Sequence, residues 1–93
     1  MANWVGVFKM KATEGNGQKI ADILRQVPAL NMEGNIKYCM AVDGDTICGY
    51  EEWTSKEAHA ASMQNPEVMW LVSQAFPMID GKPEMVFEGE NIT

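Results

Sequence analysis

Two residues of the chain, Glu51 and His59, carry the side chains that general acid–base catalysis uses. Glu51 is expected on one strand face among Ile36, Tyr38 and Trp53, where burial raises the pKa of a carboxyl group and lets it accept a proton near neutral pH. His59 is the only histidine, and imidazole titrates closest to pH 7 of all side chains. The alternatives are structural: a buried Glu51 bonded to a tyrosine or to a lysine of a second chain, and a His59 on a helix surface.

Three aromatic residues are candidates for the walls of a substrate pocket: Trp53, Tyr38 and Trp70. Large aromatic rings usually fill cores, but they also suit an aromatic ligand. Five methionines add flexible apolar groups that fit an adaptable cavity as well as a core: Met40, Met63, Met69, Met78 and Met85. A small apolar or aromatic molecule is therefore the expected substrate.

Neither a metal site nor a cofactor site is expected. One histidine and two cysteines on adjacent strands do not supply the ligands of a zinc or iron site. The glycine pair in Gly15-Asn16-Gly17 lacks both the Lys-Ser/Thr of a phosphate-binding loop and the GxGxxG spacing of a dinucleotide site. The chemistry predicted for this chain uses its own side chains alone.

Strands are expected at Trp4–Lys11, Ile36–Val42, Thr46–Trp53 and Glu84–Glu88, where apolar, β-branched and aromatic residues gather. A helix is expected from Gln18 to about Gln26, before Pro28, with one apolar stripe: Ile20, Ile23, Leu24 and Val27. A second stripe predicts a helix that ends near Pro77: Val68, Leu71, Val72, Ala75 and Phe76.

Two helix starts lie close together after the third strand. Thr54 followed by Glu57 is typical of a capping box, and Asn65-Pro66 of a capped helix with proline at its first position. The order β-α-β-β-α-α-β is that of a ferredoxin-like α+β domain over residues 1–93, with one antiparallel four-stranded sheet and helices on one face. The other face needs cover, so we expect a homodimer through the sheet.

The Asp-Gly dipeptide at 43–44 predicts a two-residue hairpin turn. That register places Cys39 opposite Cys48, which is compatible with a disulfide or with two reduced thiols in a cytosolic protein. Alternation along the two strands gives one more apolar face, on which the carboxylate is the odd member: Ile36, Tyr38, Met40, Ile47, Glu51 and Trp53.

Composition excludes several classes of partner. The 93 residues carry a net charge of −6 and have a pI near 4.5, whereas nucleic acids and anionic membranes attract basic surfaces. The sequence contains no apolar run of 18 residues and starts directly with a strand pattern, so we expect a cytoplasmic protein. Hydrophobic residues make up 46% of the chain, more than a small monomer hides, which also favours an interface or a pocket.

The pattern Tyr-Glu-x-Trp-x-Ser-x-Glu-Ala followed by a later proline resembles the antibiotic biosynthesis monooxygenase family of dimeric α/β barrels. It consists here of Tyr50, Glu51, Trp53, Ser55, Glu57, Ala58 and Pro66. The resemblance implies the fold and the dimer; for activity it implies cofactor-free oxygenases of anthrones and quinols, haem-degrading members or isomerases of small signalling sugars. One fold serves many activities, so the pattern does not choose among them.

Two positions depart from that family. Ser62 stands where the family usually has a histidine on the short helix, and His59 lies one turn earlier. Val72 stands where the haem-degrading branch would have its histidine, which argues against haem cleavage. The resemblance then implies a cofactor-independent monooxygenase of a quinol- or anthrone-like substrate, with a cofactor-free isomerase or a non-catalytic dimeric ligand-binding module as the alternatives.

Overall fold

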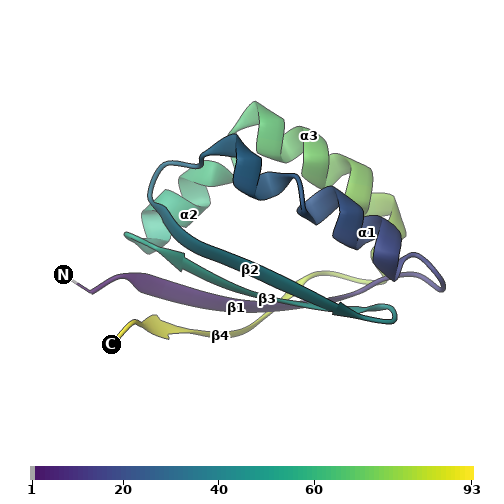
Figure 1. The fold of residues 1–93 in the computed structure, drawn as a ribbon, viewed down its shortest axis with the longest axis horizontal. Helices are drawn as coiled ribbons and strands as arrows, with labels where there is room; N and C mark the ends of the chain where they lie inside the picture. The colour runs from purple at the N-terminus through teal and green to yellow at the C-terminus, as the bar shows by residue number, and fades with distance from the viewer. Residues whose placement is uncertain (1) are drawn as a thin grey trace.

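The computed structural model, which describes residues 2–93, has one sheet with all its helices on the same face (Figure 1). The elements in chain order are β1 (Trp4–Lys11), α1 (Gly17–Leu24), η1 (Val27–Leu30), β2 (Asn35–Asp43), β3 (Thr46–Trp53), α2 (Lys56–Ser62), α3 (Pro66–Ala75), η2 (Phe76–Met78) and β4 (Glu84–Glu90). The two η elements are short 3₁₀ helices, and each contains a proline in its first turn. No helix in residues 2–93 is long and apolar enough to span a membrane.

The strands lie in the order β2-β3-β1-β4, and each neighbouring pair is antiparallel. The chain crosses from β1 through α1 to β2 and leaves a gap that β3 fills, which is the split β-α-β arrangement. The predicted ferredoxin-like α+β fold is therefore confirmed. Both ends of the chain lie at one end of the sheet (Figure 1), where the Asn91 amide donates to the Asn3 carbonyl oxygen at 2.9 Å.

The predicted register of the β2–β3 hairpin is wrong by two residues. The predicted turn would place Val42 opposite Asp45, whereas Val42 pairs with Ile47 and the strands close around Gly44 and Asp45. Gly44 has φ of +60°, a left-handed conformation that favours glycine. The physical reason for the shift lies outside the hairpin. From this turn position the Asp45 carboxylate accepts hydrogen bonds from backbone amides at the start of α1.

This shift separates the two cysteines. Cys39 pairs with Tyr50, and Cys48 pairs with Ala41, so the predicted opposition of the cysteines is wrong. Both thiols are free and exposed on the face of the sheet that carries no helix. A shift by two leaves the side chains from Lys37 onward on their predicted faces, since strand side chains alternate with a period of two. Ile36, predicted on the apolar face, lies where the pairing is irregular and is 50% exposed.

Asp45 fixes the beginning of α1 from a distance. Asn16 occupies the N-cap position without a side-chain cap bond. The Asp45 carboxylate instead accepts hydrogen bonds from the Gly15 and Gly17 amides, each at 3.0 Å. A Cβ at Gly17 would overlap the Gly44 carbonyl oxygen, so glycine is required where the hairpin turn meets the helix.

The capping of α2 differs from the prediction. Ser55, not Thr54, is the N-cap, and its Oγ accepts from the Ala58 amide at 3.1 Å. The Thr54 amide donates to the Gly34 carbonyl oxygen at 2.8 Å, so Thr54 still belongs to the end of the strand layer. The predicted capping box is therefore wrong by one residue.

The predicted start of α3 is confirmed. The Asn65 side chain accepts from the Glu67 amide at 2.9 Å, and Pro66 occupies the first turn. Helices α1 and α3 cross the sheet together, and α2 covers the end that holds the termini (Figure 1). One cluster of the core between sheet and helices is formed by Ala12, Ile20, Leu24, Ile47 and Ala75.

Candidate acid–base site in a cavity under the helices

A cavity of about 230 Å³ lies beside this core, between the sheet and the helices. Most of its wall is aliphatic, aromatic or thioether. Polar side chains from three elements line it: Tyr38 of β2, Glu51 of β3, and His59 and Ser62 of α2. Small-molecule sites are usually apolar pockets on which a few polar groups converge.

Glu51 is buried, with 8% of its surface exposed, on the face of β3 that points to the helices. Its Oε1 accepts a hydrogen bond from the Trp53 indole Nε1 at 3.1 Å. The two residues are two positions apart on one strand, so their side chains project on the same side. Burial raises the pKa of the Glu51 carboxyl group, and the Trp53 hydrogen bond opposes that rise.

His59 lies among aromatic rings. Its imidazole centroid is 5.2 Å from that of Trp4 and 5.4 Å from that of Phe8, with the Phe8 ring stacked on it, and Trp53 presents an edge at 5.4 Å. Burial lowers the pKa of His59, and the nearby charge of Lys56 lowers it further. The imidazole is thus biased toward its neutral, proton-accepting form.

The two titratable groups face each other. The His59 Nε2 atom lies 4.0 Å from the Glu51 Oε1 atom. The pKa of Glu51 is raised and that of His59 is lowered, so their proton affinities approach each other. Either group can therefore act as a proton acceptor in this cavity, and catalytic hydrogen bonds are often longer before a substrate binds.

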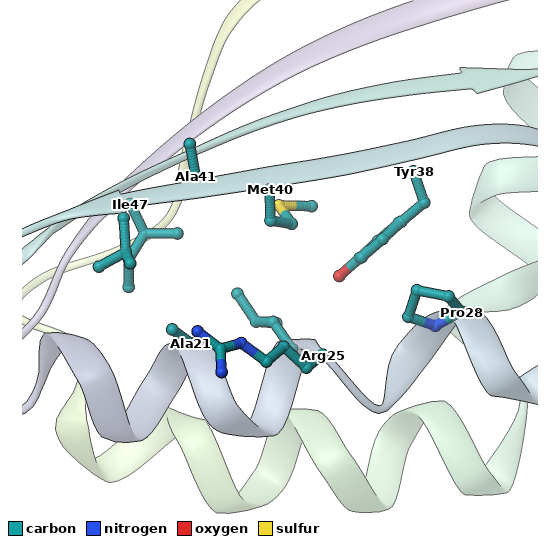
Figure 2. Close-up of a pocket in the computed structure, with 9 residues that line it drawn as sticks. Ala21, Arg25, Pro28, Tyr38, Met40, Ala41 and Ile47 are labelled. Atoms are coloured by element: carbon teal, nitrogen blue, oxygen red, sulfur yellow. The ribbon is translucent and has the colours of Figure 1, made fainter.

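Tyr38 lies where the cavity meets a second hollow. This second hollow is a cleft of about 240 Å³. Figure 2 shows it between β2 and the α1 side of the molecule, with the Tyr38 hydroxyl pointing into the space between Met40 and Arg25. Leu24, Tyr38 and Met40 line both spaces. Burial raises the pKa of the Tyr38 phenol, and the charge of Glu51 raises it further, so this hydroxyl stays protonated and able to donate a hydrogen bond.

Ser62 and Val72 also line the cavity, and neither brings a titratable group. The Ser62 hydroxyl donates to the His59 carbonyl oxygen at 2.6 Å, within its own helix. His59 and Ser62 therefore face the same space, one helical turn apart.

Of the residues predicted for the pocket wall, Tyr38 and Trp53 line the cavity, whereas Trp70 does not. Trp70 is 64% exposed and borders a separate surface hollow with Leu30 and Leu71. Met40 and Met63 line the cavity, and Met78 packs against the core. Three side chains of the predicted set are exposed: those of Met63, Met69 and Met85.

Sequence reasoning missed the contribution of β1. Phe8 and Met10 line the cavity, and Trp4 packs on His59. Alternation from Trp4 would have placed all three on one face of the strand. Within residues 2–93, no three His, Cys, Asp or Glu side chains come together as a metal site.

Comparison with known proteins gives a consistent picture. The sequence model of antibiotic biosynthesis monooxygenases matches residues 5–69. A solved structure from Chloroflexus aurantiacus, described under the same family heading, is 28% identical with a TM-score of 0.80, over 99% of this chain and 93% of that one. A search of curated proteins found no match.

Two more distant structures share the fold. SnoaB, a cofactor-independent oxygenase from Streptomyces nogalater, has a TM-score of 0.74 at 10% identity, over 100% of this chain and 94% of that one. Rv0793 from Mycobacterium tuberculosis has a TM-score of 0.78 at 11% identity, over 99% and 97% of the two chains.

Proposed function

Because the chain belongs to the antibiotic biosynthesis monooxygenase family, we propose that it is a cofactor-independent monooxygenase of a small quinol- or anthrone-like substrate. The observation that carries the proposal is the facing pair of Glu51 and His59, 4.0 Å apart in an apolar cavity. SnoaB, a cofactor-independent oxygenase, has the same fold.

The proposed reaction begins with proton removal. Glu51 or His59 takes the proton of a substrate hydroxyl or activated CH group, and the electron-rich anion reduces dioxygen. One oxygen atom is incorporated into the substrate; the other leaves as water with two substrate hydrogens, so no further reductant is needed. The apolar walls shield the anion from water, and the Tyr38 hydroxyl donates to a substrate oxygen.

The size of the cavity favours a small ring system. An engineered protein cavity of about 150 Å³ holds benzene. A cavity of about 230 Å³ therefore suits one or two fused rings, and the adjoining α1–β2 cleft offers room for a substituent or a third ring. Trp53 and Phe8 give the substrate aromatic neighbours.

We also propose that two chains associate through the face of the sheet without helices. A row of side chains on this face crosses all four strands: Cys39, Tyr50, Val7 and Phe87. Phe87 is 60% exposed, as expected of an apolar group that a partner covers. Phe87→Asp is expected to convert a dimer to a monomer in sedimentation analysis; an unchanged mass would refute this interface.

We propose a cytoplasmic location, which the two free, exposed cysteines support because they fit a reducing compartment. The acidic surface, with a net charge of −6, supports neither a nucleic acid nor a membrane as partner. No metal or cofactor has a part in the proposed reaction.

The test is dioxygen uptake by the purified, metal-free protein with a panel of hydroquinones and anthrones. Uptake above autoxidation is expected, and His59→Ala is expected to lower it at least tenfold. His59→Gln, which retains a polar side chain of similar length, separates loss of the base from loss of packing. Uptake that persists when Glu51 and His59 are both replaced would refute their roles.

The same pair also supports a second candidate, a cofactor-free isomerase. An acid and a base on one side of a substrate can move a proton between neighbouring carbons without dioxygen. Turnover under anaerobic conditions would favour this reaction, and binding without turnover in either condition would favour a dimeric ligand-binding module.

A further inference from the structure

Trp53 and Trp4 are two buried indoles, and only the N–H group of Trp53 makes a hydrogen bond. Trp53 has no exposed surface, Trp4 has 9%, and both rings pack on His59. The Trp53 Nε1 donates to Glu51 Oε1 at 3.1 Å, whereas the Trp4 Nε1 is buried without a partner among residues 2–93. The contrast isolates what the Trp53 N–H does beyond filling the core.

The Glu51 carboxyl group has few other polar neighbours. The titratable groups that face it are Tyr38 of β2 and His59 of α2. On β1 its partner is Gly6, which has no side chain. In residues 2–93, no other hydrogen bond to the Glu51 side chain is found, so the indole is its one fixed anchor.

Resting on the function proposed above, we propose that Trp53 is a positioning residue, which holds Glu51 by Oε1 and leaves Oε2 as the atom that takes the substrate proton. Trp53 was expected from the sequence only as a wall of the pocket. The hydrogen bond gives it a distinct role, because a carboxyl group anchored through one oxygen has a defined orientation in an otherwise apolar wall.

The anchor has an electrostatic consequence as well. Burial makes the charged form of Glu51 costly, and an N–H donor stabilises that form. The indole therefore moderates the pKa that burial raises and keeps the carboxylate accessible as a base. A wall residue without this bond would act on the Glu51 titration only through burial, which raises the pKa, and would not oppose that rise.

The test compares Trp53→Phe with Trp4→Phe, since each loses one buried indole beside His59. A third variant carries benzothienylalanine at position 53, which replaces the N–H by sulfur and retains the shape of the ring. Glu51 titration is followed by ¹³C NMR of the side-chain carboxyl carbon. The kcat and KM values are measured as functions of pH.

Both variants at position 53 are expected to move the Glu51 titration and the acidic limb of kcat upward by about one pH unit, and to lower kcat with little change in KM. Trp4→Phe is expected to leave the Glu51 titration where it is. An unmoved titration in the benzothienyl variant, or an equal shift in Trp4→Phe, would overturn the proposal. A change confined to KM would mean that Trp53 only lines the pocket and does not position Glu51.

The two proposals fail separately. The NMR titration needs no substrate, so an absence of dioxygen uptake in the unmodified protein would remove the oxygenase function and leave the measured anchoring of Glu51 intact. Uptake with an unshifted titration would retain the oxygenase and remove the role of Trp53.

Discussion

Glu51 and Glu52 are consecutive residues of β3, and their side chains lie on opposite faces of the sheet. The surroundings on the two faces shift the pKa values of the two carboxyl groups in opposite directions. Glu51 points to the helices, lines the cavity and has one hydrogen-bond donor, the Trp53 indole. Glu52 points to the other face, where Asn3 and Asn91 donate to its Oε2 at 2.9 and 2.8 Å.

The pKa values diverge for this reason. Burial raises the pKa of Glu51, whereas the amides of Asn3 and then Asn91 lower that of Glu52. A carboxylate with two donors is a stable anion that ties the chain ends to the sheet. A carboxyl group with one donor in an apolar cavity suits the base that we propose Glu51 to be. Position on the strand, not residue type, thus separates the proposed chemical role of Glu51 from the structural role of Glu52.

The largest expected effect is on activity. Glu51→Gln removes a base and is expected to lower kcat by about 10²- to 10⁴-fold, the range typical of a general base. Glu52→Gln changes the neighbouring carboxylate outside the cavity and is expected to leave kcat within about twofold. Dioxygen-uptake kinetics on both variants decide the point; comparable losses in the two would show that the sheet faces are not chemically distinct.

The faces are also expected to differ in packing. Ile47, with 1% of its surface exposed, lies in the core under the helices, and Ile47→Ala is expected to cost about 2–5 kcal/mol of unfolding free energy. Cys48→Ala, on the face without helices, is expected to stay within about 0.5 kcal/mol in the monomeric Phe87→Asp background, where no partner covers that face. Urea denaturation measures both. A large cost at Cys48 would mean that the open face is itself tightly packed.

The pH dependence of stability is expected to separate the same two carboxyl groups. The folded-state pKa of Glu51 is raised, so its contribution is present at low pH and is lost as pH rises through that pKa. The pKa of Glu52 is lowered, so its contribution is present at neutral pH and is lost as pH falls.

Glu51→Gln should therefore reduce the loss of unfolding free energy that occurs as pH rises. Glu52→Gln should reduce the loss that occurs as pH falls. Asp45, whose pKa the Gly15 and Gly17 amides lower, retains part of the acid decline in both variants. Unfolding free energies between pH 3 and 8 test the assignment; an exchange of the two effects would contradict it.

Much of this arrangement was predictable because alternation is a local property. The period of two placed Tyr38, Glu51 and Trp53 on one face, and the structure has them there around one cavity. The same rule applied to β1 would have added Phe8. Trp70 lies off the stripe formed by Val68 and Leu71, and its exposure agrees with the helical period that defined that stripe.

The wrong predictions, of the hairpin register and of the α2 cap, have two kinds of cause: contacts between distant residues, and neighbouring residues that suit the same position almost equally well. The hairpin register depends on bonds from Asp45 to amides at 15 and 17, about 30 residues away along the chain, which no turn preference contains. Thr54 and Ser55 are adjacent hydroxyl residues that both suit an N-cap, and the strand-end bond of Thr54 to Gly34 decides between them. The cap of α1 comes from another element altogether.

The smallest expected effect tests why Glu52 differs from Glu51. Asn3→Ala removes the donor that lowers the pKa of Glu52 most, and the Glu52 titration is expected to move toward the ordinary value of a glutamate while Asn91 retains part of the shift. The Glu51 titration is expected to stay fixed, because its environment lies on the other side of β3. ¹³C NMR resolves both carboxyl groups in one experiment, with Asn35→Ala as a control, since that amide donates only to backbone oxygens. A joint movement of both titrations in Asn3→Ala would mean that charge is coupled across the sheet, and the separation of a reactive face from a structural one would then be lost.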